Sequence, residues 1–329
     1  MNWKNASVAL IATIALGATL SGCNRGDGAA ATSKPLSSTM VISTLNNPFF
    51  VSVADGAKAQ AETSGMKLDV QNANNKDQGL LDLTSTALTK QPSVLIVDPV
   101  SSDSGASVTN QANQAKVPVV AFDREPSSGD LASFIGYDAI QAGRAGAKAL
   151  GEAVGGKGQV AEIQGIMGTS VAQDRSKGFN EGIKAFPGIQ IVAVQAAEFD
   201  RGKALDVMTN VLQAHPDING VYAANDEMAM GVVSALKARG LSGTVKVVGN
   251  DGIADALAAI KAGTMYATNA ESPFVLGKQV VTIAAKVAKG EQVDKHTVLQ
   301  GRLVTAKDIT DLCTFLTGEG DTKTCAGLS

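Results

Sequence analysis

The chain has 329 residues, of which 44% are hydrophobic and 18% are charged, and its formal net charge is −3 at pH 7. This length allows one or two domains, each with its own hydrophobic core. The slightly negative charge and the lack of clustered basic residues argue against nucleic acid as a partner.

The amino terminus has the pattern of an export signal. Lys4 is followed by an apolar stretch from Ala6 to Leu20, which is short for a membrane span and ends in small residues. The sequence LSGC that ends at Cys23 resembles a bacterial lipobox, which implies cleavage before Cys23 and lipidation of its thiol and amino group. An ordinary signal peptide with an incidental cysteine is less favoured, because it would leave a free thiol on an exported protein.

We therefore predict a signal peptide over residues 1–22 and a flexible tether, rich in Gly, Ala, Ser and Thr, over residues 23–38. The protein is then exported and anchored by lipid in the periplasm or on the outer face of the cytoplasmic membrane. No later apolar run approaches the length of a membrane span, so the lipid is the only expected contact with a membrane.

Short β-branched runs alternate with amphipathic, helix-length segments through the rest of the chain. Predicted strands lie near residues 67–71, 94–97, 119–122, 132–136, 160–163, 189–194, 220–224 and 245–248. Predicted helices lie near residues 51–64, 77–91, 102–115, 170–186, 201–214 and 226–239. Strands such as Val94–Val97 are apolar at every position, as parallel strands covered on both faces require. The number of these strand–helix units is larger than one open sheet usually holds. We therefore predict two doubly wound α/β domains, the first ending near Tyr137.

The segment Met40–Phe50, MVISTLNNPFF, has the pattern of a strand end followed by a helix. Pro48 stands where a helix can begin with proline. Ligands of open α/β sheets bind beyond the carboxyl ends of the strands, so Asn47, Phe49 and Phe50 should lie at a crevice. The two rings either form a flat ligand face or simply fill the core between helix and sheet.

Polar residues also follow other predicted strands, namely Asp123 and Arg124, Asn225, and the segment Gly249–Asp251. Carboxylates, guanidinium groups and amides at strand ends suit a neutral polyhydroxylated ligand better than a phosphate. Structural roles are the alternative. Asp226 could be a helix N-cap, and Asp123 with Arg124 could form a surface pair of little energetic weight.

These residues carry a resemblance to a known family. From Met40 to about Thr305 the chain resembles the bacterial ribose-binding protein and its relatives, the type I solute-binding proteins of ABC sugar importers. The blocks that match in order and spacing are STLNNPFF (43–50), DR (123–124), GTS (168–170) leading to Arg175, FDR (199–201), NDEMAMG (225–231) and VVGNDG (247–252).

The resemblance implies two Rossmann-like, doubly wound lobes joined by a hinge of three crossovers, near Tyr137, near Glu271 and Ser272, and near Gln300. It replaces a purely sequential division of the chain. The N-terminal lobe would comprise residues 39–137 and 272–299, and the C-terminal lobe residues 138–271 and 300–306.

Carried over position by position, the resemblance makes Phe49, Phe50 and Phe199 aromatic walls around a sugar ring. The residues expected to hydrogen-bond the hydroxyl groups are Asn47, Asp123, Arg124, Arg175, Asn225 and Asp251.

Three further positions depart from the ribose pattern. In the ribose-binding pattern that the chain resembles, Asn stands at the position of Asp98, Phe at that of Asn250 and Gln at that of Glu271. An ionised carboxylate accepts hydrogen bonds but cannot donate them. We therefore expect a ligand with more donors and a less flat face than ribose, such as another pentose or hexose, a furanose form or a sugar alcohol. Binding of ribose despite these changes is the alternative.

The family implies that ligand binding closes the hinge and that a permease recognises the closed form. We expect a monomer without metal or cofactor. A sensor that presents a sugar or an autoinducer to a chemoreceptor or histidine kinase is the alternative function. An enzyme is disfavoured, because the sequence lacks a phosphate-binding loop, a zinc-binding helix and a histidine at a strand end.

The tail, residues 307–329, lies beyond the resemblance. In an exported chain Cys313 and Cys325 are expected to form a disulfide, with a short helix over about 308–316. His215 and His296, the chain's two histidines, lie far from both cysteines in sequence, so no metal pattern competes. We assign the tail no function from sequence.

Overall fold

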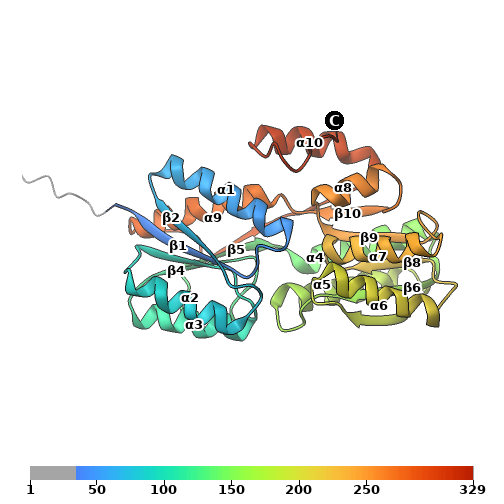
Figure 1. Cartoon of the computed structure of the whole chain (residues 1–329), viewed down its shortest axis with the longest axis horizontal. Helices are drawn as coiled ribbons and strands as arrows, with labels where there is room; N and C mark the ends of the chain where they lie inside the picture. Colours follow the sequence, from blue (N-terminus) through green and yellow to red (C-terminus); the bar gives the residue numbers. More distant parts are fainter. Residues whose placement is uncertain (1–34, 329) are drawn as a thin grey trace, which may run out of the picture. The chain divides into compact units, whose positions relative to one another are not determined.

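The computed structural model describes residues 35–328, so the predicted signal peptide, Cys23 and most of the predicted tether lie outside the described residues. The strands form two six-stranded sheets, and each sheet belongs to one α/β lobe (Figure 1). The prediction of two doubly wound lobes is confirmed. Ser37 and Ser38, which we expected in the tether, already belong to the first strand.

The sheet of the N-lobe has the order β11-β5-β4-β3-β1-β2, and all its neighbours are parallel. Its strands are β1 (Ser37–Ile42), β2 (Lys67–Asn72), β3 (Val94–Val97), β4 (Val119–Phe122), β5 (Ser133–Tyr137) and β11 (His296–Leu299). Its helices are α1 (Pro48–Ser64), α2 (Asp77–Thr89), α3 (Ser102–Gln114) and α9 (Pro273–Ala288).

Helices cover both faces of this sheet, which explains why β3 and β4 are apolar at every position. Met40 and Ile42 of β1 belong to the apolar cluster that includes α1 and α9, whereas Val41 belongs to the cluster of α2 and α3. Each successive side chain of a strand points to the opposite face, so every position must be apolar when both faces are buried.

The sheet of the C-lobe has the order β12-β10-β9-β8-β6-β7, and only β12 is antiparallel to its neighbour. Its strands are β6 (Lys157–Gln164), β7 (Gly188–Ala196), β8 (Gly220–Ala223), β9 (Lys246–Asp251), β10 (Ala267–Ala270) and β12 (Arg302–Val304). Its helices are α4 (Ala139–Ala153), α5 (Ser170–Gly182), the 3₁₀ turn η1 (Ile183–Ala185), α6 (Arg201–Ala214), α7 (Asp226–Ala238) and α8 (Ala254–Lys261).

The chain crosses between the lobes after β5, after β10 and after β11. The hydroxyl of Tyr137, at the first crossover, donates to the carbonyl oxygen of Ser272, at the second, over 3.2 Å. After β12 the chain forms a short 3₁₀ turn, η2 (Ala306–Asp308), and the helix α10 (Ile309–Gly318). Cys313 in α10 forms a disulfide with Cys325, and their Cα atoms are 5.5 Å apart.

Among the described residues, no helix combines the length and the apolar character that crossing a bilayer requires.

Candidate functional site

A small cavity lies where strand ends of the two lobes face each other. Its walls are formed by Asn47, Phe49, Phe50, Asp123, Arg124, Val171, Arg175, Phe199, Asn225 and Asp251. Nine of these ten residues are among those that we expected, from the sequence, to contact a ligand. Val171 was missed, because an apolar residue in the first turn of a helix cannot be told from a core residue by pattern.

The N-lobe contributes an amide, a guanidinium and a carboxylate to this cavity. Asn47 is the N-cap of α1, and its Oδ1 accepts from the backbone N–H of Phe49 over 2.8 Å. The side-chain oxygen is therefore occupied, and the amide NH₂ group is the part of Asn47 left to serve a ligand. Arg124 Nη1 donates to the carbonyl oxygen of Pro99 over 3.1 Å, which fixes the guanidinium beside Asp123.

The C-lobe contributes a matching set. Asn225 is the N-cap of α7, and its Oδ1 accepts from the backbone N–H of Met228 over 3.0 Å. Arg175 Nη1 donates to the carbonyl oxygen of Ala224 over 3.0 Å and lies 3.7 Å from Asp251 Oδ1. Each lobe thus presents one capping amide, one arginine and one aspartate to the same cavity.

Aromatic rings from both lobes complete the walls. The rings of Phe49 and Phe50 meet edge to face, with centroids 5.2 Å apart. The guanidinium carbon of Arg124 lies 5.4 Å from the ring centroid of Phe50 and 5.6 Å from that of Phe199. Phe49 and Phe50 are also buried in the N-lobe core, so they fill the space between helix and sheet as well as lining the cavity.

Three residues of the cavity wall have positive φ angles, a backbone conformation that glycine adopts more readily than other residues. The φ angles are 57° at Asp123, 59° at Phe199 and 126° at Asp251. Such conformations are unfavourable for residues with a side chain, and they concentrate at functional sites where surrounding structure holds them. Here they turn polar and aromatic side chains into the space between the lobes.

Each arginine of the cavity lies between two buried carboxylates. Arg124 Nε is 3.8 Å from Asp98 Oδ1 and 3.7 Å from Asp123 Oδ2. Arg175 Nη2 is 3.0 Å from both oxygens of Glu271, in addition to its contact with Asp251. Four carboxylates therefore share two guanidinium groups, and all six side chains are nearly inaccessible to solvent.

This surplus of buried acid shifts the pKa values of the site. Burial raises the pKa of Asp98 to about 7, because the attraction of Arg124 only partly offsets the loss of hydration. Burial also raises the pKa values of Asp123, Asp251 and Glu271 above their ordinary range.

Arg175 keeps its charge. Burial alone would lower the pKa of its guanidinium, but Glu271 and Asp251 outweigh that effect and raise it.

The three residues that depart from the ribose pattern do not line the cavity. Asp98 and Glu271 are completely buried behind Arg124 and Arg175. Asn250 Nδ2 donates to Glu271 Oε1 over 2.9 Å, and its Oδ1 accepts from Asn269 over 2.9 Å. In this structure they bond to protein groups, in contrast to the ligand contacts expected of them.

The structure corrects other expectations from sequence. Asn225, rather than Asp226, caps α7, while the carboxylate of Asp226 accepts from the backbone N–H groups of Gly252 and Ile253. Asp123 and Arg124 are buried and do not form a surface pair. Strand β9 continues to Asp251, because the segment that we placed after the strand pairs with β10.

The cavity is tight. Its volume is only about 20 Å³, which is room for one or two water molecules. Hydrogen bonds also join the two lobes directly, from Ser102 N to Gly168 O over 3.0 Å and from Glu125 N to the hydroxyl of Ser170 over 2.9 Å. The lobes are therefore closed on each other, and a sugar ring can enter only if they separate.

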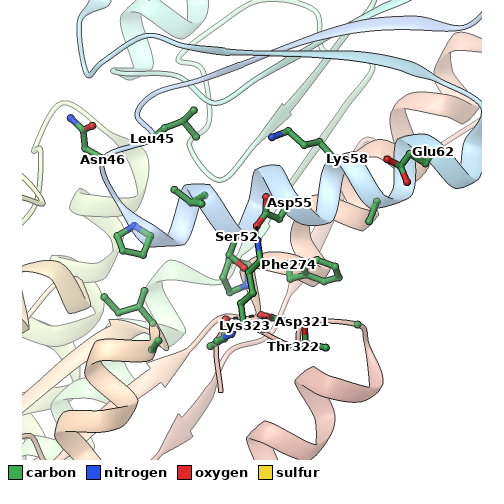
Figure 2. Close-up of a pocket in the computed structure, with 18 residues that line it drawn as sticks. Leu45, Asn46, Ser52, Asp55, Lys58, Glu62, Phe274, Asp321, Thr322 and Lys323 are labelled. Atoms are coloured by element: carbon green, nitrogen blue, oxygen red, sulfur yellow. Dashed lines mark hydrogen bonds and ion pairs between the residues drawn. The ribbon is translucent and has the colours of Figure 1, made fainter. Parts of the chain in front are cut away.

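A larger groove of about 720 Å³ lies along α1 (Figure 2). Its charged side chains include the exposed Lys58 and Glu62, and Phe274 is the one aromatic residue among those that line it. We place the functional site in the smaller cavity, because buried polar groups that converge between aromatic rings are typical of ligand sites. Within residues 35–328 no group of three or more His, Cys, Asp or Glu residues is placed to hold a metal ion.

Comparison with known proteins agrees with this architecture. The ribose import binding protein RbsB of Salmonella typhimurium is 39% identical over 304 residues, which cover 92% of this chain and 99% of that protein. The xylitol-binding protein of Mycolicibacterium smegmatis is 29% identical, over 91% of this chain and 85% of that protein.

Among solved structures, an ABC transporter solute-binding protein from Actinobacillus succinogenes with bound D-allose is similar, with a TM-score of 0.80 and 30% identity. The match covers 84% of this chain and 99% of that one. A model of the periplasmic binding protein domain matches residues 39–292. This chain belongs to the periplasmic binding protein family, in the group that contains the ribose import binding proteins.

Proposed function

We propose that this protein is the extracytoplasmic sugar-binding component of an ABC importer and binds one monosaccharide or small sugar alcohol between its lobes. The observation that carries the proposal is the matched pair of polar sets around one cavity, with an amide, an arginine and an aspartate from each lobe. The similarity to proteins named for ribose, D-allose and xylitol supports the same class of ligand.

The chemistry of the two sets suits adjacent hydroxyl groups. A sugar hydroxyl both donates and accepts, so it can donate to Asp123 or Asp251 while accepting from an arginine or from a capping amide. The apolar faces of the ring would pack against Phe50 and Phe199. A phosphate would suit this site poorly, because it would meet two aspartates at the wall and two further carboxylates behind it.

Asp98, Asn250 and Glu271 would influence the choice of sugar through the arginines. Glu271 accepts both of its hydrogen bonds to Arg175 from Nη2, and Arg175 Nε has no hydrogen-bond partner among the described residues. The orientation set by Glu271 thus determines where the remaining N–H groups of Arg175 meet a ligand. We propose that the bound sugar differs from ribose in its hydroxyl pattern.

Binding would be coupled to movement of the lobes. A ligand that contacts both lobes favours the closed arrangement in proportion to its stronger interaction with that arrangement. The closed surface would then be recognised by the permease. Anchoring through a lipid on Cys23, a monomeric state and the absence of any reaction on the bound sugar belong to the same proposal.

Isothermal titration against a panel of aldoses, ketoses and alditols tests the function. We expect tight binding of at least one member and recovery of the sugar unchanged. Asp251→Asn should abolish or strongly weaken binding, whereas the matched control Asp206→Asn, on the exposed face of α6, should not. Lack of binding to the whole panel would contradict the proposal, and tight binding of ribose alone would contradict the altered specificity.

A further inference from the structure

The C-terminal tail, of which the structure describes residues 307–328, runs over both lobes (Figure 1). It starts in the C-lobe, where η2 follows β12 and contacts α8. Ile309, Leu312 and Leu316 of α10 are buried in the main apolar cluster. The tail is therefore a packed part of the molecule that the proposed sugar site does not explain.

After α10 the tail reaches the N-lobe. Lys278 Nζ, in α9, donates to the carbonyl oxygen of Glu319 over 3.0 Å and to its carboxylate over 3.1 Å. Lys323 Nζ lies 2.6 Å from the carboxylate of Asp55 in α1 (Figure 2). Two helices of the N-lobe thus hold the segment between Glu319 and Lys323.

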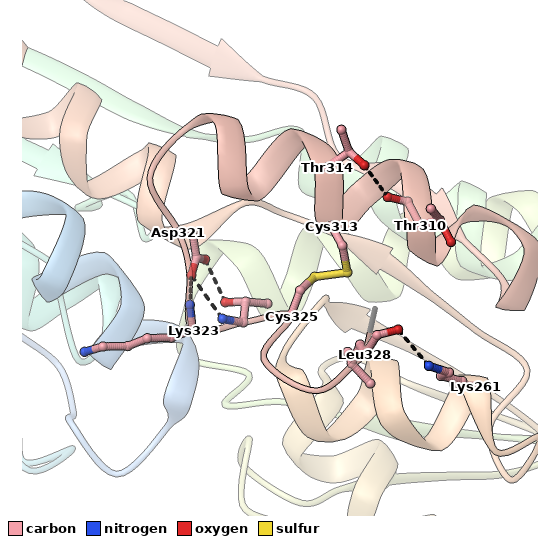
Figure 3. The surroundings of a disulfide bond; sticks show 9 residues. Lys261, Thr310, Cys313, Thr314, Asp321, Lys323, Cys325 and Leu328 are labelled. Carbon is pink, nitrogen blue, oxygen red and sulfur yellow. Dashed lines mark hydrogen bonds between the residues drawn. A yellow bond between two sulfur atoms is a disulfide. The ribbon is translucent and has the colours of Figure 1, made fainter.

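The tail then returns to the C-lobe. Lys261 Nζ, at the end of α8, donates to the carbonyl oxygen of Leu328 over 2.7 Å (Figure 3). The disulfide of Cys313 and Cys325 ties this return to α10. Asp321 stiffens the turn, because its carboxylate accepts from the backbone N–H groups of Lys323 and Thr324.

We propose that the tail is a strap between the lobes, which stabilises the arrangement in which the sugar cleft is closed. The proposal rests on the hinge motion of the proposed function and adds a fourth, non-covalent tie to the three crossovers. The tail is anchored in one lobe and bonded to the other, so a rotation of the lobes must break or stretch its contacts with Asp55 and Lys278. Contacts that are present in one arrangement only shift the equilibrium toward it.

The neighbouring groove supports a role in lobe movement. It is lined by α1 and the start of α9 from the N-lobe, by Ile253 and Ala254 from the C-lobe, and by residues 320–324 of the tail (Figure 2). The groove therefore has walls in both lobes, and its shape must change when they move. The tail is the only element that lines it and also bonds to helices of both lobes in the described part of the chain.

The two N-lobe contacts are ion pairs at a partly exposed surface. The exposed side-chain fractions are 82% for Lys323 and 28% for Asp55, and 31% for Lys278 and 39% for Glu319. Pairs of this kind are individually weak and are screened by salt. The strap should therefore change the closed population several-fold, and its effect should fade at high ionic strength.

The double variant Asp55→Ala with Lys278→Ala tests the strap, with Lys261→Ala as the matched control. The control removes a lysine bond to the same tail, but within the C-lobe. Small-angle scattering without sugar should show a larger radius of gyration for the double variant than for the wild type, and no change for the control. The affinity for the best sugar of the panel should fall about threefold to tenfold in the double variant at low salt, and the difference should shrink at high salt.

Equal radii and equal affinities in the wild type and the double variant would overturn the strap, and so would a more compact double variant. Circular dichroism melts of all three proteins establish that they are folded. Scattering without sugar needs no ligand, so it tests the strap even if no sugar in the panel binds. Failure of the strap and failure of the proposed function are thereby distinguishable.

Discussion

Arg175 and Glu271 form a bidentate contact, in which Nη2 of the arginine lies 3.0 Å from both carboxylate oxygens. Glu271 is completely buried, and of these two residues only Arg175 lines the cavity between the lobes. Glu271 immediately precedes the crossover at Ser272, so this contact joins an arginine of the proposed ligand site to one of the crossovers between the lobes.

Substitution of Glu271 by Gln tests its role as a positioning residue. A glutamine has one oxygen acceptor and no charge, so Arg175 would lose its bidentate partner. We expect about tenfold weaker binding of the sugar that the wild type prefers, and a changed order of preference, because the remaining N–H groups of Arg175 would meet the ligand in a different orientation. Calorimetry with D-ribose, D-allose, xylitol and the best sugar of the panel measures both quantities.

A double-mutant cycle with Arg175→Lys provides the control. If Glu271 acts through Arg175, then Glu271→Gln should have little further effect in the Arg175→Lys background. Additive losses would instead indicate that Glu271 contacts the ligand itself.

Replacement of Phe199 by Leu should weaken sugar binding, because it removes the aromatic wall of the C-lobe but keeps an apolar side chain. The loss in binding free energy should be about 0.5–1.5 kcal/mol, the range of a specific aromatic contact. Phe134→Leu is the control, since Phe134 packs beside His296 at the edge of the N-lobe sheet, away from the cavity. Equal effects of both substitutions in a binding titration would argue against a wall at Phe199.

Substitution of Asp98 by Asn should stabilise the fold at neutral and alkaline pH. Burial raises the pKa of Asp98 from 3.8 to about 7, so between these values the folded protein binds a proton that the unfolded chain releases. The carboxylate therefore lowers the free energy of unfolding as pH rises from about 4 to about 7, by at most about 4 kcal/mol. Asparagine carries no such charge.

Chemical denaturation of the wild type and of Asp98→Asn at several pH values measures this effect. The stability advantage of the variant should be largest at pH 8 and should vanish toward pH 4. A variant that is less stable than the wild type at pH 8 would show that the attraction between Asp98 and Arg124 outweighs the burial of the charge.

Reduction of the disulfide between Cys313 and Cys325 should loosen the tail and leave the lobes intact. A disulfide that closes a loop of this size stabilises by about 3 kcal/mol in the chain-entropy view. Hydrogen exchange should therefore show lower protection of α10 after reduction, by up to about this free energy. Strands β3 and β8 serve as internal controls, and equal loss of protection there would mean that the tail and the lobes unfold together.

Local patterns predicted the fold well where apolar residues recur with the regular period of a strand or a helix. The strands at 94–97 and 119–122 and the helix at 201–214 have the predicted bounds. The end of β9 was misplaced, because Gly249, Asn250 and Asp251 are typical of a turn. They remain in the strand only because β10 supplies backbone partners and Asn269 hydrogen-bonds Asn250, which is information from elsewhere in the chain.

The walls of the site were easier to predict than the layer behind them. Side chains that follow a strand end in an α/β sheet point toward the crevice, and this rule favoured seven of the nine expected residues that line the cavity; the other two, Arg175 and Phe199, were expected from the family resemblance alone. Whether Asp98, Asn250 or Glu271 faces the cavity depends on where Arg124, Arg175 and Asn269 lie in space. Sequence order does not contain those distances.

A crystal structure with the best-bound sugar of the panel tests the central claim most directly. We predict a sugar ring between Phe50 and Phe199, with hydroxyl groups bonded to Asp123 and Arg124 from one lobe and to Arg175 and Asp251 from the other. A sugar seated in the groove along α1, or one that bonds to a single lobe, would contradict the account.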